Sequence, residues 1–226
     1  LKAISALKFV VPSYQSEEAA AERCLLAFGE FDAHHAMFLD GNLIESQSNL
    51  DGLRDGVRVC DLSTGVSEFG EMVSSRLGDV ASLDKESMVA LNTAGMDSGI
   101  LIYVPKGVQV EKPIHLGFFS SASAEAELIQ PRVLVVVEDG ASLSLFESYC
   151  GLGDGTYLNN VVFEAYTGAN ARLTHIKVQD EAGGATHVQT VAVRQERDSQ
   201  YTSFNVSLGG LTARTAITVE LAGAGA

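Results

Sequence analysis

The chain has 226 residues, and its 15 Lys and Arg against 29 Asp and Glu give a formal net charge of −14 at pH 7. Hydrophobic residues make up 46% of it and only 4 residues are proline, a composition typical of a folded globular protein rather than a disordered chain. The acidic charge without a basic patch argues against nucleic-acid binding, and no apolar run is long enough to cross a bilayer. We therefore expect one large domain, or one domain with an appendage, with neither nucleic acid nor membrane as a partner.

The three cysteines, Cys24, Cys60 and Cys150, are far apart and odd in number. This argues against a disulfide framework and predicts a reducing compartment. We expect the cytoplasm, because the N-terminus shows no signal-peptide pattern. Without a CxxC or HxxxH spacing, no closed metal site can be written down from the sequence. The chain begins without Met and ends in Gly-Ala-Gly-Ala within an expected strand and turn, so both ends look cut.

The front of the chain predicts a mixture of helices and strands. An apolar run stopped by Pro12 precedes a helix that begins at the N-cap Ser16 and ends at Gly29. The pair Asp40-Gly41 lies between two apolar runs and predicts a hairpin with a type I′ turn. The further predicted elements are a strand at residues 57–62, a helix at 66–77 closed by Gly78, and a helix at 84–93.

Residues 91–116 mark the change from this mixed front half to an almost purely β back half. An apolar strand is predicted at residues 100–104, and Pro105-Lys106-Gly107 predicts the turn that follows it. Beyond this point side chains alternate with a period of two, and we expect the apolar face of each strand in the core and the other face in solvent. In the two last predicted strands these apolar positions are Thr202, Phe204, Val206 and Leu208, and then Thr215, Ile217, Val219 and Leu221.

Similar turns recur along the back half. The turn at Gly140 resembles that at Gly168, and further ones follow at a similar spacing at residues 193–197 and 219–223. A diffuse repeat of this length is typical of a solenoid, in which each unit is a coil that stacks on its predecessor. A run of hairpins in a β-sandwich fits the same spacing, so spacing alone leaves both architectures open.

Four short motifs stand out along the chain: LNTA at residues 91–94, VPKGV at 104–108, EKPI at 111–114 and NARLTHIK at 170–177. Together they resemble the SufB/SufD family, whose members are scaffold proteins of iron–sulfur cluster assembly, and the last motif resembles SufD-type proteins. The resemblance implies a mainly β fold, a right-handed parallel β-helix preceded by a small α/β lead-in. It implies a lead-in at residues 1–95 and a core at 96–226 that is truncated at its C-terminus. It further implies that the N-terminal helical part of full-length relatives is missing here.

The same resemblance implies a function without catalysis. The expected role is a scaffold subunit of a SufBCD-type complex that forms a heterodimer with a SufB-like paralogue and is coupled to a SufC-like ATPase. The resemblance also allows a homodimer that forms through the edges of the β-helix. No cofactor is expected in this fragment, and an iron–sulfur cluster would be held transiently on the assembled complex. Within the family, the length of the lead-in and the lack of a SufB-type cysteine motif favour SufD.

Two other classes of protein share the alternating strands. A carbohydrate-active β-helix enzyme predicts a secretion signal and stacked charged residues on one exposed sheet. A cupin-like metal-binding or small-molecule-binding protein predicts closely spaced His and Glu on adjoining strands. The sequence shows none of these signs.

The candidate metal ligands are Cys150 and His175. A thiolate could bind iron or sulfur, although a single cysteine at a strand end is more simply a packing residue. His175 is expected on the surface beside Lys177, on the face opposite Ile176. His187 and Gln189 point to one side of their strand and need one more neighbouring ligand to hold a metal. The remaining histidines, which are His34, His35 and His115, are expected to be incidental.

Overall fold

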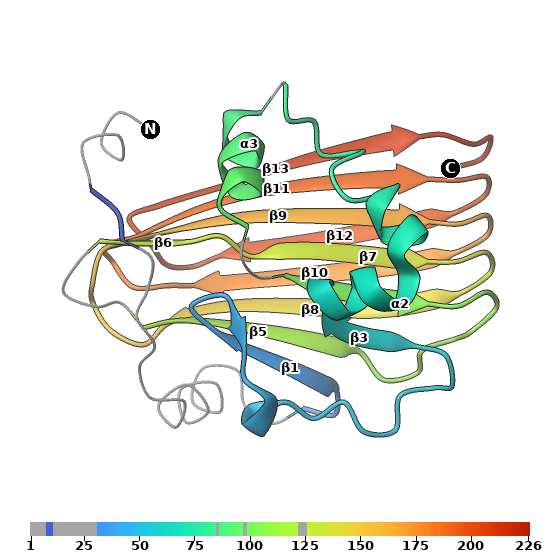
Figure 1. Cartoon of the computed structure of the whole chain (residues 1–226), viewed down its shortest axis with the longest axis horizontal. Helices are drawn as coiled ribbons and strands as arrows, with labels where there is room; N and C mark the ends of the chain where they lie inside the picture. The colour runs from blue at the N-terminus through green and yellow to red at the C-terminus, as the bar shows by residue number, and fades with distance from the viewer. Residues whose placement is uncertain (1–7, 11–30, 85, 97–98, 122–125) are drawn as a thin grey trace.

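Two layers of mostly parallel strands form the body of the molecule (Figure 1). The computed structural model describes residues 8–10, 31–84, 86–96, 99–121 and 126–226. Among these residues, one sheet has six strands in the order β12 (Gln200–Ser207), β10 (Arg172–Asp180), β8 (Ser142–Gly151), β5 (Ile114–Ser120), β1 (His34–Leu39) and β2 (Asn42–Leu43). The other described sheet has the order β13 (Thr212–Leu221), β11 (Ala185–Gln195), β9 (Tyr157–Thr167), β7 (Arg132–Val137), β4 (Ile100–Val104) and β3 (Arg58–Asp61), and β6 (Glu127–Ile129) also pairs with β9.

From β7 onwards the chain passes from one sheet to the other with every strand, so each coil contributes one strand to each layer. Within each sheet, β8 to β13 pair in parallel with the strand of the coil before. Parallel pairing of strands that are adjacent in space and one full coil apart in sequence is the signature of a solenoid, not of a hairpin sandwich. The predicted parallel β-helix architecture is confirmed.

The repeat length shortens along the chain. Ser142 pairs with Arg172, and Arg172 pairs with Gln200, a slightly shorter interval. The interval is shorter again in the last coil, where Thr186 pairs with Thr212. The predicted alignment of Gly140 with Gly168 is therefore wrong, because the structural counterpart of Gly140 is Asn170. Both residues have positive φ, of 66° and 58°.

The predicted elements of the front half that fall within the described residues are present with shifted ends. Asp40 and Gly41 both have positive φ, as a type I′ turn requires, and they join β1 to β2. Helix α2 (Leu62–Ser74) begins earlier than predicted, because the Asp61 side chain accepts the Thr64 N–H and caps it. Helix α3 (Ser87–Ala94) begins later than predicted, and a 3-10 turn, η2 (Glu45–Gln47), follows the hairpin. The helix predicted between Ser16 and Gly29 lies outside the described residues.

The strands of the front half belong to the same two sheets as the back half. β1 pairs in parallel with β5, and β4 pairs in parallel with β7. β2 and β3 instead pair antiparallel, at the two ends of the sheet orders. The lead-in thus forms an irregular first coil of the solenoid.

Both helices lie over the sheet that contains β9 and β11 (Figure 1). A buried ion pair between Arg132 and Glu164, exposed by 1% and 0%, joins them to it. Arg132 donates to the Asn92 side chain of α3, and Glu164 accepts the backbone N–H groups of Gly78 and Ala81 after α2. Neither helix is long and apolar enough for a membrane span, and no other helix in the described part of the chain is.

The interior between the sheets is apolar near the front of the solenoid and polar near its last coils. The main core combines residues of both sheets, such as Leu145, Phe163 and Val191. The predicted core face of β12 is wrong, because Phe204 is 61% exposed and Leu208 is also exposed. The prediction for β13 has the faces right: Ile217 and Val219 lie beside the buried Val191 and Val193.

Candidate functional site

A cluster of polar side chains fills the interior between β8, β10, β9 and β11. Leu173 belongs to the main core, and because side chains alternate along a strand, His175, Lys177 and Gln179 point to the same interior. All three are buried, with exposures of 1% or less. The expectation that His175 lies on the surface is therefore wrong. The prediction followed the local pattern, which favours Ile176 as the core residue. In the structure Ile176 lies on the outside of the sheet and is 37% exposed.

Glu147 of β8 is the first centre of this interior cluster. Its Oε2 atom accepts hydrogen bonds from His175 Nε2 at 3.1 Å and from Gln189 Nε2 at 2.8 Å. Burial alone would raise the pKa of Glu147, but the facing His175 and these hydrogen bonds lower it below its ordinary value. The other ring nitrogen of His175 lies 2.9 Å from the Tyr201 hydroxyl, and its ring stacks on Phe163.

Lys177, His187 and Glu181 form the second centre. Lys177 Nζ lies 2.8 Å from His187 Nε2 and 3.0 Å from Thr215 Oγ1. His187 Nδ1 in turn lies 2.8 Å from Glu181 Oε2. A lysine ammonium has only donors, so Nε2 accepts and the ring proton sits on Nδ1, facing the carboxylate.

Burial controls the protonation of this second centre. Burial lowers the pKa of Lys177 to about 8, against the opposing effect of Glu147 and Glu181. Burial also lowers the pKa of His187, which favours the neutral ring. The pKa of Glu181 would be raised by burial, but His187 and the amides of Asn159 and Gln179 lower it.

The order of groups, an amine, an imidazole and a carboxylate, is the order found around activated nucleophiles. Here all three are buried, so a substrate has no direct approach to Lys177 through the described residues. What the arrangement does is tie three strands together across both sheets, from β10 to β11 and β13.

The two candidate metal ligands lie on opposite faces of one sheet. His175 points into the interior, whereas Cys150 packs with Leu39 and Phe119 on the outer face. In the register of β8 and β10, Cys150 lies beside Asp180, at the far end of the strand from His175. The structure does not bring them together. Within the described part of the chain, no group of three or more His, Cys, Asp or Glu side chains is placed to hold a metal ion.

Cys60 offers little chemistry at neutral pH. Cys60 is half-buried, and burial together with Glu68 and Asp61 raises the pKa of its thiol to about 11, so the thiol stays protonated. Cys24 lies outside the described residues.

A pair of histidines forms a contact that sequence reasoning missed. His35 of β1 and His115 of β5 are register neighbours, and their Nδ1 atoms lie 3.0 Å apart. His115 Nε2 faces the Ser148 hydroxyl at 2.7 Å, and the ring is enclosed by Phe31 and Phe146. Burial, with a smaller effect of His35, lowers the pKa of His115 to about 3. Nothing in the sequence signals this pair, because its members lie on strands that are far apart along the chain.

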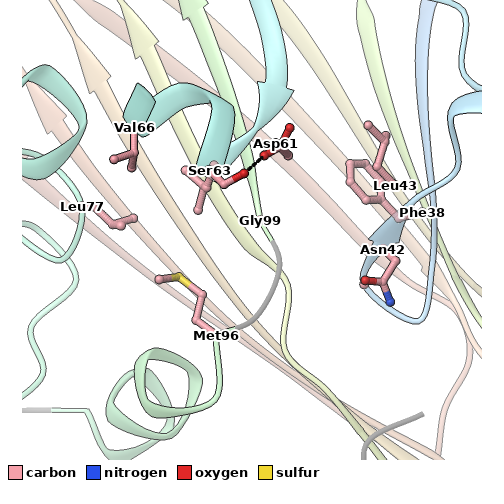
Figure 2. Close-up of a pocket in the computed structure, with 11 residues that line it drawn as sticks. Phe38, Asn42, Leu43, Asp61, Ser63, Val66, Leu77, Met96 and Gly99 are labelled. Carbon is pink, nitrogen blue, oxygen red and sulfur yellow. Dashed lines mark hydrogen bonds between the residues drawn. The ribbon is translucent and has the colours of Figure 1, made fainter. Parts of the chain in front are cut away.

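A surface pocket of about 410 Å³ lies between the β1–β2 hairpin, the start of α2 and Gly99 (Figure 2). Figure 2 shows Val66, Leu77 and Met96 on one side of it and Phe38 and Leu43 on the other. The Asp61 carboxylate at its rim already accepts from Ser63 and Thr64, and these hydrogen bonds lower its pKa to about 2. This carboxylate therefore caps α2 and is not free for a ligand.

Comparison with known proteins gives the family. The model of the SufBD protein N-terminal region matches residues 13–116, and the model of the SufBD core domain of SUF-system iron–sulfur cluster assembly matches residues 118–226. The chain belongs to the SufB/SufD family. The two family models meet inside β5, where the irregular first coil gives way to the regular ones.

Individual relatives agree with the family models. The chain is 31% identical over 225 residues to the SufBD family protein slr0076 of Synechocystis, covering 95% of this chain and 49% of that protein. It is 32% identical over 195 residues to the chloroplastic protein ABCI7 of Arabidopsis thaliana, covering 84% and 41%. It is 30% identical over 148 residues to the iron–sulfur cluster assembly protein SufD of Bacillus subtilis, covering 64% and 33%. The chain thus spans half or less of the length of these curated relatives.

Proposed function

We propose that this SufB/SufD family chain is part of a non-catalytic scaffold subunit of a SufBCD-type complex. The subunit pairs with a SufB-like paralogue and works with a SufC-like ATPase. The observation that carries the proposal is the match of the two SufBD family models to residues 13–116 and 118–226. The 30% identity to a SufD supports the SufD side of the family.

The solenoid supports a scaffold role. Parallel strands in two layers, tied by interior hydrogen bonds that cross coils, make a stiff body rather than a hinge. The iron–sulfur cluster is cargo in this proposal, held transiently on the assembled complex, and the fragment has no cofactor of its own. The proposed role includes no catalysis. The burial of the titratable groups in the interior supports this part of the proposal.

The cytoplasm is the proposed compartment. The described Cys60 is a free thiol, which fits a reducing environment.

Co-purification tests the proposed function. The full-length parent protein is expressed with SufB-like and SufC-like partners, together and pairwise, and complexes are measured by size-exclusion chromatography with light scattering. A stoichiometric complex that needs the SufB-like partner supports the proposal. A protein that stays alone, or forms only a homodimer through strand edges, contradicts the heterodimer.

A further inference from the structure

The interior cluster contains oxygen atoms that the protein itself leaves without hydrogen-bond donors. Among the described residues these are Glu147 Oε1, Gln189 Oε1, Gln179 Oε1 and Asn159 Oδ1. Each belongs to a side chain that is at most 2% exposed, so bulk water does not reach it. The Tyr149 hydroxyl interacts with the Glu147 carboxylate and can donate to it. Even when it donates to Glu147, the three amide oxygens still lack donors.

The amide nitrogens of these side chains are already used, so turning the amides over would only exchange one unpaired group for another. Gln189 Nε2 donates to Glu147, Gln179 Nε2 donates to Glu181 and to the Gly209 carbonyl, and Asn159 Nδ2 donates to Glu181. A buried oxygen without a donor destabilises the folded chain, and proteins normally avoid this with ordered water. Several such atoms in one cluster indicate a shared ligand site rather than isolated defects.

The chemistry of the ligand follows from the groups that face it. The carboxylates Glu147 and Glu181 each face a histidine, and the ammonium of Lys177 lies near both. The unpaired amide atoms are all acceptors, whereas the unpaired Tyr149 hydroxyl can also donate. A ligand that pairs with the amide oxygens must therefore present hydrogen atoms or positive charge. An anion would face two carboxylates and several carbonyl oxygens.

We propose that the interior between β8, β10, β9 and β11 is a binding site for small electropositive ligands, namely ordered water molecules or a monovalent cation, which bridge Glu147, Gln189, Gln179 and Asn159. The site lies inside the solenoid and is independent of any partner subunit. It makes the polar stretch of the interior a solvated chamber rather than a dry core.

A crystal structure of the full-length protein at high resolution tests the site. We expect solvent density within hydrogen-bonding distance of Gln189 Oε1 and of at least one of Gln179 Oε1 and Asn159 Oδ1. Crystals grown with thallium(I), which replaces potassium and gives an anomalous signal, separate the two sources: density with an anomalous peak is a cation, and density without one is water. Side chains that pair directly with one another and leave no density overturn the proposal.

A matched pair of variants tests the same point in solution. Gln189→Leu removes one unpaired oxygen, and Gln195→Leu removes a buried glutamine of the same strand that donates to Ser199 and has no fully buried atom without a partner. Long-lived water is measured by magnetic-relaxation dispersion of oxygen-17 for the full-length protein. We expect Gln189→Leu to reduce the long-lived fraction and Gln195→Leu to leave it unchanged. Equal values in all three proteins overturn the proposal, whether or not the SufB-like and SufC-like partners bind.

Discussion

Lys177 Nζ donates to His187 Nε2 across 2.8 Å inside the solenoid, and this contact joins the two sheets. Its members lie on β10 and β11, and Thr215 of β13 accepts from the same ammonium. One buried side chain therefore holds the last coils in register. The acidic partners that favour its charge are Glu147 and Glu181.

Replacement of Lys177 tests this role. We expect Lys177→Met to lower the free energy of unfolding by about 1–3 kcal/mol, because the buried His187 Nε2 loses its hydrogen-bond donor. Urea unfolding followed by circular dichroism measures it. Lys106→Met is the matched control: that lysine is 79% exposed in its pairing with Asp139, and we expect no change in the urea midpoint. Equal effects of the two variants would show that the interior lysine is not required for stability.

The same lysine predicts an unusual alkaline behaviour. Its pKa is about 8 in the folded chain against an ordinary value of 10.5, so between these values the unfolded chain holds a proton that the folded chain lacks. The contribution of Lys177 to stability therefore rises with pH across this window. We expect the stability difference between the parent and Lys177→Met proteins to grow from pH 8 to pH 10. A constant difference over that range contradicts the lowered pKa.

His115 predicts a loss of stability in mild acid. The folded chain keeps this ring neutral down to a pKa of about 3, whereas the unfolded ring takes up a proton below its ordinary pKa of 6.5. The stability that depends on the neutral ring is therefore lost as pH falls, by about 2 kcal/mol between pH 6.5 and pH 5. Equilibrium unfolding at several pH values measures the slope.

The control for this slope is His115→Asn, which keeps a polar group opposite Ser148 but does not titrate. The groups that face His115 are His35, Ser148, Phe31 and Phe146. We expect the variant to be less stable at pH 7 and to have a shallower acid slope. An unchanged slope would assign the acid sensitivity to another group.

The buried Arg132–Glu164 pair predicts a large effect of a single substitution. Arg132→Met leaves the Glu164 carboxylate buried without its cation, and we expect a loss of about 3–5 kcal/mol in unfolding free energy. Adding Glu164→Gln removes the uncompensated charge and keeps an oxygen for Gly78 N–H and Ala81 N–H, so the double variant should be more stable than Arg132→Met. A double variant as unstable as the sum of the single variants contradicts this account.

The turn at Asn170 predicts a difference between two small substitutions. Its φ of 58° is left-handed, a conformation that glycine adopts freely and a β-branched residue resists. We expect Asn170→Val to cost about 1–2 kcal/mol and Asn170→Gly to cost less. Thermal unfolding of both variants compares them directly. A valine variant as stable as the glycine variant would show that the backbone relaxes at this turn.

Local chemistry was sufficient to predict much of the fold. Asp40-Gly41 has the residues that a type I′ turn requires, and the apolar run at Ile100–Val104 coincides with β4. The family resemblance, based on motifs such as 104–108, supplied the choice between solenoid and sandwich that the spacing of turns left open. Each of these signals lies within a few residues, where propensity and periodicity act.

Local sequence patterns did not predict the polar cluster in the interior. In β10 the residues His175 and Lys177 alternate with Ile176 and Val178, and the local pattern favours the latter pair as core. The coils, however, are offset by even numbers of residues, so each inward position stacks on an inward position of the next coil. The apolar residues of the neighbouring coils fix which face of each strand lies in the interior. His175 and Lys177 are on that face of β10 and are therefore buried.

The sequence by itself determined the family, the period-two strands, the hairpin and the acidic character of this chain, because these follow from residue type and short-range spacing. Only the tertiary structure decided which face of β10 and β12 is interior, where His175 and Cys150 lie, and that His35 meets His115. Those outcomes depend on the register between coils, which is a property of residues at least one full coil apart in the chain. Stacking of whole coils outweighs the polarity of any one strand, since a shift by one residue would turn every side chain of the strand to the opposite face.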